Sequence, residues 1–349
     1  MIKNYLKTAF RNLWKNKTYG FLNIFGLAVG VTCAGFIFLW VEDELSYDHN
    51  NYKRDQLYQV IENQAYEGKT YTFGATPGLL AVGMKEEIPG IKNTCRMTWG
   101  QYTLFSLGDK AIYEEGFYAD SSIFSMFTLP FEQGKKENAL TQLHSVVITE
   151  KMAKKFFGDD KTIIGKSLKL DNKEDYIVSG VLKDLPENTS IQFGWLAPFQ
   201  VYLDKNTWLQ QWGNNGIQTF AELDKKADPA VINKKLYDYI KSKDTTAIAR
   251  PFLFAMNDWR LKSKFEEGKQ VGGRIQHVRM FSIIAWIILL IGCINFMNLA
   301  TARSEKRARE VGVRKVLGAG KRNLIIQFLG EAVMISFLSV ALSIVIMYL

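Results

Sequence analysis

The sequence predicts an α-helical membrane protein with three transmembrane helices and a large α+β extracytoplasmic domain between the first and second helices. Three apolar runs predict this fold class: residues 20–41 and 280–300 carry no charge, and residues 324–349 carry only Glu331. Each run is long enough to cross a hydrocarbon core of ~30 Å as a helix. The chain is therefore expected to divide into six segments, at 1–19, 20–41, 42–276, 277–301, 302–323 and 324–349.

The first segment, residues 1–19, is predicted to form an amphipathic helix on the cytoplasmic surface of the membrane. Apolar residues recur at helical spacing from Ile2 to Trp14, and the opposite side carries Lys3, Lys7, Arg11 and Lys15. A basic helix with aromatic residues on its apolar face is typical of a membrane interface, where it contacts lipid. Packing of the same face on a partner or on the protein's own membrane helices is an equal and compatible alternative.

Charges that flank the first run predict its orientation. Five basic residues and no acidic residue precede position 20, whereas Glu42, Asp43 and Glu44 follow the run. Because positive flanks stay in the cytoplasm, we expect a cytoplasmic N-terminus and an extracytoplasmic location for residues 42–276. Cys95 is the only cysteine of that region, and an extracytoplasmic domain without a disulfide is ordinary for a bacterial cell envelope, so we expect a bacterial inner membrane with residues 42–276 in the periplasm. The run is long for a signal peptide and has no small-residue cleavage site after it, which favours an uncleaved span.

The positive net charge, +9 with a pI of about 9.2, belongs to the edges of the membrane segments. Residues 42–276 contain 30 Lys and Arg against 32 Asp and Glu, so the outer region is nearly neutral. A nucleic-acid-binding protein would need a basic face on a folded domain, and that class is excluded. A mean hydropathy of −0.08 fits three spans diluted by a large water-soluble domain.

The outer region, residues 42–276, is long enough for one large domain or two small ones, and it contains both strand and helix patterns. Strands are predicted at Leu57–Tyr66, Ser145–Thr149 and 218–223, with a hairpin made of Ser167–Leu170 and 176–182. One helix is predicted from Glu150 to a stop at Gly158. A second is capped by Asp228, begins at Pro229 and continues without a break to Lys243. Residues 244–273 receive no element and are expected to lead to the second span.

Catalytic chemistry is largely missing from the sequence. His49, His144 and His277 lie far apart and show no metal-ligand spacing, so we expect no metal, no cofactor and no catalytic residue. The segment around Gly165-Lys166-Ser167 fails as a phosphate-binding loop because Asp160 stands where the motif needs glycine. The chain lacks Walker motifs and is not expected to be an enzyme.

The loop at 302–323 is the most informative functional segment. It is strongly basic, and Glu310 and Arg314 stand four residues apart with the acid first, the favourable order on a helix. Val313, Val316 and Leu317 would form a small apolar patch on this helix. Such a segment can insert into a groove on a partner protein. The alternative is that the bases only set topology and bind lipid phosphates, which we favour for Lys321 and Arg322.

These residues carry a resemblance to a known family. The order of fixed positions resembles the transmembrane and coupling-loop pattern of MacB/FtsX-family ABC transporter permeases, through Asn295, Met297-Asn298-Leu299, Arg307, Glu310-Val311-Gly312-Val313-Arg314-Lys315, Gly318-Ala319, Gln327-Phe328-Leu329 and Glu331-Ala332. Residues 147–193 and 220–240 resemble the MacB-like periplasmic core domain, and the N-terminal segment resembles the family's opening. The resemblance covers most of the chain and is weakest over 63–117 and 244–273.

The resemblance implies a membrane (permease) subunit that couples ATP hydrolysis by a partner ATPase subunit to movement of its periplasmic domain, which is called mechanotransmission. It also implies a dimer with a second permease copy or module. By this resemblance, the residues expected to contact the ATPase are Arg307, Glu310, Val311, Gly312, Val313, Arg314, Lys315, Val316, Leu317 and Gly318.

Two other functions remain open at this point: an FtsX-like regulator of an envelope enzyme, and a membrane sensor. A sensor would normally carry a large cytoplasmic output domain, whereas the largest cytoplasmic piece expected here is the loop at 302–323. Family members have at least a fourth membrane helix, so the chain is expected to be one incomplete module. The sequence does not name a cargo or a periplasmic partner.

Overall fold

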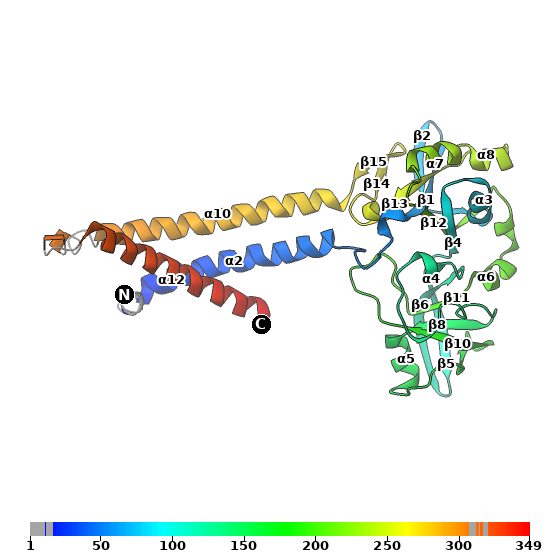
Figure 1. Cartoon of the computed structure of the whole chain (residues 1–349), viewed down its shortest axis with the longest axis horizontal. Coiled ribbons are helices and arrows are strands. Elements are labelled where there is room, and N and C mark those ends of the chain that lie inside the picture. Colours follow the sequence, from blue (N-terminus) through cyan, green and yellow to red (C-terminus); the bar gives the residue numbers. More distant parts are fainter. Residues whose placement is uncertain (1–10, 12–16, 307–311, 314, 317–319) are drawn as a thin grey trace. The chain divides into compact units, whose positions relative to one another are not determined.

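The computed structural model describes residue 11, residues 17–306, residues 312, 313, 315 and 316, and residues 320–349. The chain forms two compact units (Figure 1). The membrane unit contains residues up to Leu45 and from Gln276 onward, and the core domain runs from Ser46 to Ile275. The amphipathic helix predicted at 1–19 falls almost entirely outside the described residues.

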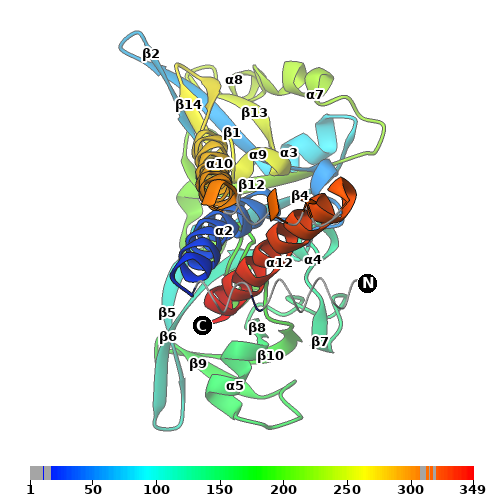
Figure 2. The same ribbon diagram turned by 90° about the vertical axis from the view of Figure 1, so that its left-hand side faces the viewer.

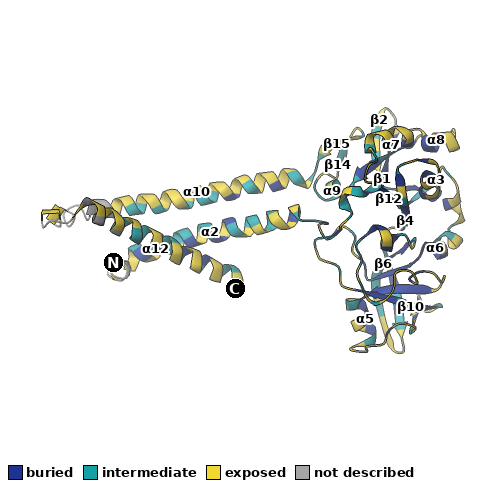
Figure 3. Cartoon of the chain, in the orientation of Figure 1, coloured by how far each residue is buried: buried dark blue, intermediate teal, exposed yellow. Residues whose placement is uncertain are grey.

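The described part of the membrane unit contains three helices that are long and apolar enough to cross a membrane, as the sequence predicts. They are α2 (Lys17–Leu45), α10 (Arg274–Lys306) and α12 (Lys321–Tyr348). Each helix extends beyond its apolar run, because the flanking polar residues continue the backbone hydrogen bonding. Figure 3 shows large exposed stretches on all three helices, and many of the exposed side chains are apolar. Lipid or another protein surface must cover them in a membrane.

Small residues bring the membrane helices together. A Cβ placed on Gly30 of α2 would lie 3.9 Å from the Cα of Gly292 on α10, so the two backbones approach closely there. Small residues have this role in many membrane proteins because helix association depends on close packing. On α12, Glu331, Ile335 and Ser339 are buried at a spacing of four, which places them on one face of that helix.

The core domain is an α+β domain, as predicted. Its strands are β1 (Leu57–Tyr66), β2 (Lys69–Phe73), β3 (Thr76–Pro77), β4 (Ile91–Met97), β5 (Gln101–Leu107), β6 (Lys110–Ala119), β7 (Phe131–Gly134), β8 (Ser145–Thr149), β9 (Ser167–Leu170), β10 (Glu174–Leu182), β11 (Trp195–Pro198), β12 (Asn215–Leu223), β13 (Arg250–Ala255), β14 (Lys264–Glu266) and β15 (Lys269–Gly272). Its helices are α3 (Leu80–Glu87), α4 (Ile123–Met126), α5 (Glu150–Phe157), α6 (Phe199–Lys205), α7 (Pro229–Leu236), α8 (Tyr239–Lys243) and α9 (Met256–Trp259), with short 3₁₀ turns at Arg54–Gln56 and Thr207–Gln210.

One long sheet organises this domain. Its strand order is β11-β8-β10-β9-β5-β6-β4-β12-β1-β13, with β2, β3 and β7 attached to β1, β12 and β10. Because β11 also pairs with β6, the strands from β11 to β6 in this order form a closed ring. In Figure 2 the β1–β2 hairpin lies at one end of the core domain and the β5–β6 hairpin at the other end of the domain. Separate hydrophobic clusters follow the sheet. One surrounds Trp195, a middle one surrounds Phe127, and a third contains Val60 together with residues of α3, α7 and α8.

The strand and helix predictions for the core domain are mostly confirmed. The structure has strands at Leu57–Tyr66, Ser145–Thr149 and Ser167–Leu170, and α5 ends before Gly158. The single helix predicted from Pro229 to Lys243 is wrong, since the structure breaks it into α7 and α8. Residues in α7 and at the break contact β13: Asn233 accepts a hydrogen bond from the Leu253 amide, and Asp238 lies 3.5 Å from Arg250.

Candidate functional site

Only part of the predicted ATPase-contacting segment falls within the described residues. Gly312, Val313, Lys315 and Val316 have helical backbone conformation. Val313 is 61% exposed and Val316 is 88% exposed, so neither side chain packs into the membrane unit. The other predicted residues lie outside the described part of the chain, namely Arg307, Glu310, Val311, Arg314, Leu317 and Gly318. The described residues thus present two exposed valines, three positions apart on a helical segment between α10 and α12.

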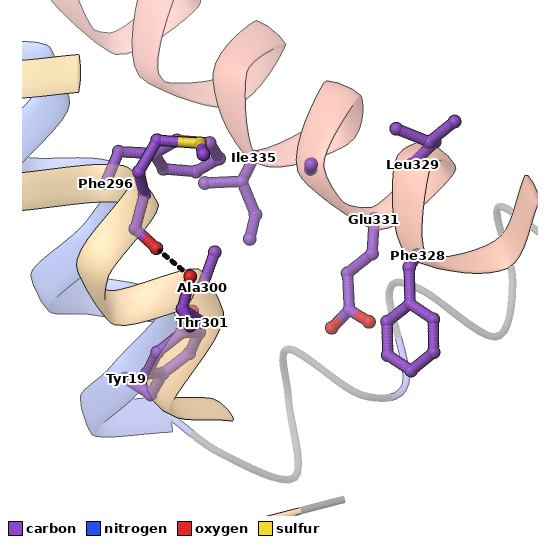
Figure 4. A pocket seen from close by; sticks show the side chains of 10 residues that line it. Tyr19, Phe296, Ala300, Thr301, Phe328, Leu329, Glu331 and Ile335 are labelled. Atoms are coloured by element: carbon purple, nitrogen blue, oxygen red, sulfur yellow. Dashed lines mark hydrogen bonds between the residues drawn. The ribbon is translucent and has the colours of Figure 1, made fainter. Parts of the chain in front are cut away.

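A cavity of about 200 Å³ lies in the membrane unit near the helix ends that border this segment. Its walls come from the first turn of α2, the C-terminal part of α10 and the N-terminal part of α12, as Figure 4 shows. Its lining is mainly apolar and includes Tyr19, Phe296 and Phe328. Its lining also carries polar groups: the hydroxyl of Tyr19, the carboxylate of Glu331, and the Thr301 hydroxyl, which donates to the Met297 carbonyl at 2.9 Å. Residues on either side of the 302–323 loop therefore line one cavity.

The core domain holds its own first residues firmly. Residues 46–53, which we call the stem, follow α2 directly, and Asp48 is 2% exposed. The Asp48 carboxylate accepts hydrogen bonds from the Thr189 hydroxyl at 2.9 Å, from the Ser190 amide at 2.7 Å and from the Ser190 hydroxyl. The Asp48 amide donates to the Asn188 carbonyl at 2.9 Å. One aspartate thus attaches the stem to the loop before β11.

A second set of stem contacts reaches the loop after α4. Asn51 Oδ1 accepts a hydrogen bond from the Thr128 amide at 3.0 Å, and the Tyr52 amide donates to the Thr128 hydroxyl at 3.1 Å. Lys53 Nζ donates to the Ser125 carbonyl at 2.6 Å and pairs with the buried Glu222 carboxylate at 2.9 Å. The stem is therefore integrated into the domain at several points, and motion of its backbone must be shared with these loops.

The start of α10 is attached at a different place. The Ile275 amide donates to the Leu261 carbonyl at 2.9 Å. Gly273 has φ of 144°, and a Cβ there would lie 3.0 Å from the Leu261 carbonyl oxygen, so glycine is required. The adjoining β14–β15 hairpin contacts the β1–β2 hairpin, since Asn63 Nδ2 donates to the Gly268 carbonyl at 2.9 Å. The first and the last residues of the core domain are thus held by separate sets of contacts.

Comparison with known proteins identifies the family. Residues 21–239 match the model of the MacB-like periplasmic core domain, and residues 282–349 match the FtsX-like permease C-terminal model. The chain belongs to the MacB/FtsX family of permeases. MacB/FtsX-family membership confirms the resemblance inferred from the loop motif.

Individual relatives are distant and longer. The chain is 27% identical over 237 residues to the macrolide export ATP-binding/permease protein MacB of Aggregatibacter actinomycetemcomitans, covering 66% of this chain and 34% of that protein. It is 26% identical over 348 residues to the pyoverdine export ATP-binding/permease protein PvdT of Pseudomonas syringae pv. tomato, covering 95% of this chain and 49% of that protein. The chain thus spans between a third and half of the length of these curated relatives.

Among solved structures, a permease-protein domain from Porphyromonas gingivalis is similar, with a TM-score of 0.50 and 24% identity over 58% of this chain and 91% of that one. This likeness supports the α+β fold of the core domain. The family match and the candidate spans together describe a membrane protein with a periplasmic domain.

Sequence reasoning missed the stem contacts and the membrane cavity. Asp48 lies in the short polar segment SYDHNN after the first span, which marks a turn. Its partners Thr189 and Ser190 are about 140 residues away in the sequence. A local pattern gives no signal for such a pairing. The cavity depends on how three helices meet, which hydrophobic runs alone do not predict.

Proposed function

We propose that the chain is the membrane subunit of an ABC transporter in which a partner ATPase drives movement of the periplasmic core domain. The observation that carries the proposal is the helical segment with exposed Val313 and Val316, placed between two membrane helices of a MacB/FtsX-family permease. Two exposed valines three positions apart can serve as the apolar anchors of a helical segment that inserts into a groove on another protein. In this proposal the N-terminus and the 302–323 loop are cytoplasmic, by the positive-inside rule.

The transmitted motion would reach the core domain through the helices themselves. A displacement at the 302–323 loop moves α10 and α12, which the loop connects. The stem and the Leu261–Ile275 contact then pass motion of α2 and α10 to the domain. This mechanism does not require the membrane helices to form a transport path through the membrane.

The proposal includes a second copy or module of the permease beside the first. The α10 helix exposes a row of large apolar side chains at helical spacing, which includes Ile283, Ile287, Leu290, Ile294 and Met297. Lipid covers such a row adequately, and a second permease helix covers it equally well, since membrane helix association relies on packing rather than on the hydrophobic effect.

Co-purification tests the ATPase partnership. The tagged full-length chain is solubilised in mild detergent, and bound nucleotide-binding subunits are identified by mass spectrometry. We expect an ABC ATPase with the parent protein and its loss from the double variant Arg314→Glu, Val316→Asp. The matched control is Val231→Asp, which places the same charge at an exposed valine (49%) on α7 of the core domain. The control should retain the ATPase.

Two results would contradict the proposal. If the parent binds no ATPase under conditions that keep the membrane unit folded, the permease function loses its support. If the double variant and the parent retain the same amount of ATPase, the docking role of the segment is wrong even though the partnership stands.

A further inference from the structure

A buried carboxylic acid on β1 has an unusual hydrogen-bonding environment. Glu62 is fully buried within the core domain. Its Oε1 atom accepts hydrogen bonds from Gln64 Nε2 and from Asn215 Nδ2. Its Oε2 atom has no hydrogen-bond partner among the described residues, and neither has Asn215 Oδ1. Two neighbouring side chains therefore each bury an acceptor that lacks a donor.

No described cation forms an ion pair with Glu62. Strand register identifies the groups on its face of the sheet, since directly opposed residues point to the same side. Phe73 of β2 and Pro251 of β13 lie opposite Glu62, and neither is titratable. The β12 positions on this face, Asn215, Ile217 and Thr219, are also uncharged, as are Thr76 and Pro77 of β3. The ionisable groups that share this side are Tyr58 and Tyr66 of β1, Lys69 and Tyr71 of β2, Arg96 of β4, which lies opposite Thr219, and groups on the helices that pack over it, Glu87 of α3 and Tyr239 of α8. Arg96 is paired with Asp120 at 2.9 Å, and Glu87 with Lys243 at 2.7 Å, so neither is paired with Glu62.

Their positions leave Glu62 without electrostatic support for an ionised form. Lys69 lies opposite Tyr66, four residues along β1, and is exposed. The Tyr66 hydroxyl donates to Gln64 Oε1 and does not contact Glu62 directly. Burial raises the pKa of Glu62 to about 7, and the two amide donors lower the pKa only in part. A buried ionised carboxylate with one unpaired oxygen is costly.

A single proton removes this deficit. If Glu62 Oε2 carries a hydrogen, it can donate to Asn215 Oδ1 while Asn215 Nδ2 donates to Glu62 Oε1. Both unpaired acceptors then take part in one reciprocal acid–amide pair. The number of donors and acceptors at this position therefore fits the neutral acid and not the carboxylate.

We propose that Glu62 is a proton-sensing residue of the core domain, neutral in acidic medium and ionised in alkaline medium, and that its ionisation weakens the contact between β1 and the start of β12. Asn215 is the first residue of β12 and lies opposite Pro77 of β3. The loop before it is held by Asn214, whose Nδ2 donates to the Trp208 carbonyl at 2.8 Å. The Trp208 ring in turn packs against Gly216. Ionisation of Glu62 would thus change the packing around Trp208, whose fluorescence can report it. This inference does not depend on an ATPase partner.

The sign of the pH dependence follows from the raised pKa. The unfolded chain has the ordinary glutamate value of 4.5, and the folded domain has a value of about 7. Between these values the folded state holds a proton that the unfolded state has lost, so stability falls as pH rises. The stabilisation is fully present below the unfolded pKa and is lost above the folded one. The linked change in the unfolding equilibrium is on the order of 10²-fold.

Glu62→Gln tests the proposal in the full-length chain in detergent. Glutamine supplies an NH₂ donor where the neutral acid carries its hydroxyl, and it does not titrate. Thermal unfolding is followed at about pH 5.5 and about pH 8.5, on either side of the folded pKa. We expect the variant to match the parent at the lower pH and to unfold at a higher temperature than the parent at the higher pH. Tryptophan fluorescence of the parent should titrate near neutrality, and that transition should vanish in the variant.

Glu222→Gln is the matched control. Glu222 is also a buried glutamate, but it forms ion pairs with Lys53 and Lys92 at 2.9 and 3.0 Å. Its amide variant should be destabilised at both pH values. Infrared difference spectra give an independent readout, since the parent should show a protonated carboxylic acid at about pH 5.5 that Glu62→Gln lacks. The proposal is overturned if that band is missing, or if Glu62→Gln lowers stability equally at both pH values.

Discussion

Asp48 offers the sharpest test of how the core domain holds the stem. Asp48→Ala removes the acceptor of three hydrogen bonds and leaves the Thr189 hydroxyl and the Ser190 amide without that partner in a buried site. A hydrogen bond to a charged group contributes roughly 1.5–3 kcal/mol, and unpaired buried donors cost about 1–3 kcal/mol each. Asp48 also has φ of 62°, a conformation that alanine adopts at a cost of about 1 kcal/mol.

These contributions are not additive, and the loop at 187–190 relaxes in part, so the net effect is smaller than their sum. We expect Asp48→Ala to lower the free energy of unfolding by about 3–5 kcal/mol. For a domain of this size, a loss of that magnitude lowers Tm by on the order of 10 °C. Asp48→Asn keeps the shape of the side chain and tolerates the positive φ, but it removes the negative charge that strengthens the hydrogen bonds. It should therefore lower the free energy of unfolding by only about 1–3 kcal/mol.

The assay is thermal unfolding of the full-length chain in detergent, together with hydrogen exchange at residues 46–53 and 187–190. The control is Asp244→Ala, which removes hydrogen bonds from the Thr246 amide and hydroxyl at an exposed position. The control should lose only about 1 kcal/mol because water replaces the carboxylate there. If Asp48→Ala unfolds within about 1 °C of the parent, or loses no more stability than Asp244→Ala, the stem is not held as described.

Two further substitutions test the packing of each unit. Gly273→Ala should lower the free energy of unfolding of the core domain by about 2 kcal/mol or more, because φ is 144° and a Cβ would press on the Leu261 carbonyl oxygen. An unchanged Tm would refute this. Asn23→Ala should leave the membrane unit as stable as the parent or slightly more stable in detergent unfolding, since neither polar atom of the buried Asn23 side chain has a hydrogen-bond partner among the described residues. A clear loss of stability would show that this amide does bind a partner.

Hydrophobic runs and local turn chemistry were sufficient to predict much of this fold. The spans were recognisable because a long uncharged stretch has few alternatives, and β8 was recognisable because five consecutive β-branched or small residues precede a capped helix. The break between α7 and α8 was not predictable, since no glycine or proline marks it and the contacts that Asn233 and Asp238 make there are with β13, a separate segment of the chain. β13 itself was missed because its short run RPFLFA has no alternation of polar and apolar residues.

The functional residues could likewise be predicted from the sequence only in part. The motif in the 302–323 loop is local, so its chemistry and its likeness to permeases were readable from the residues. Glu62 gave no such signal, since LYQVIENQAY predicts a strand with glutamate as an ordinary polar member. Only the register of β2, β12 and β13 shows that this glutamate is enclosed and that Asn215 is its neighbour.

The stem also has a practical consequence for anyone who wishes to isolate the core domain. The first strand begins at Leu57, and a boundary drawn there from secondary structure would discard the carboxylate of Asp48 and the amide of Asn51. The loops at 125–128 and 187–190 would then lose their bonding partners, although both would still be present in the fragment. A soluble version should therefore begin at Ser46 and end no earlier than Ile275, so that both attachment points of the membrane helices stay within the folded body.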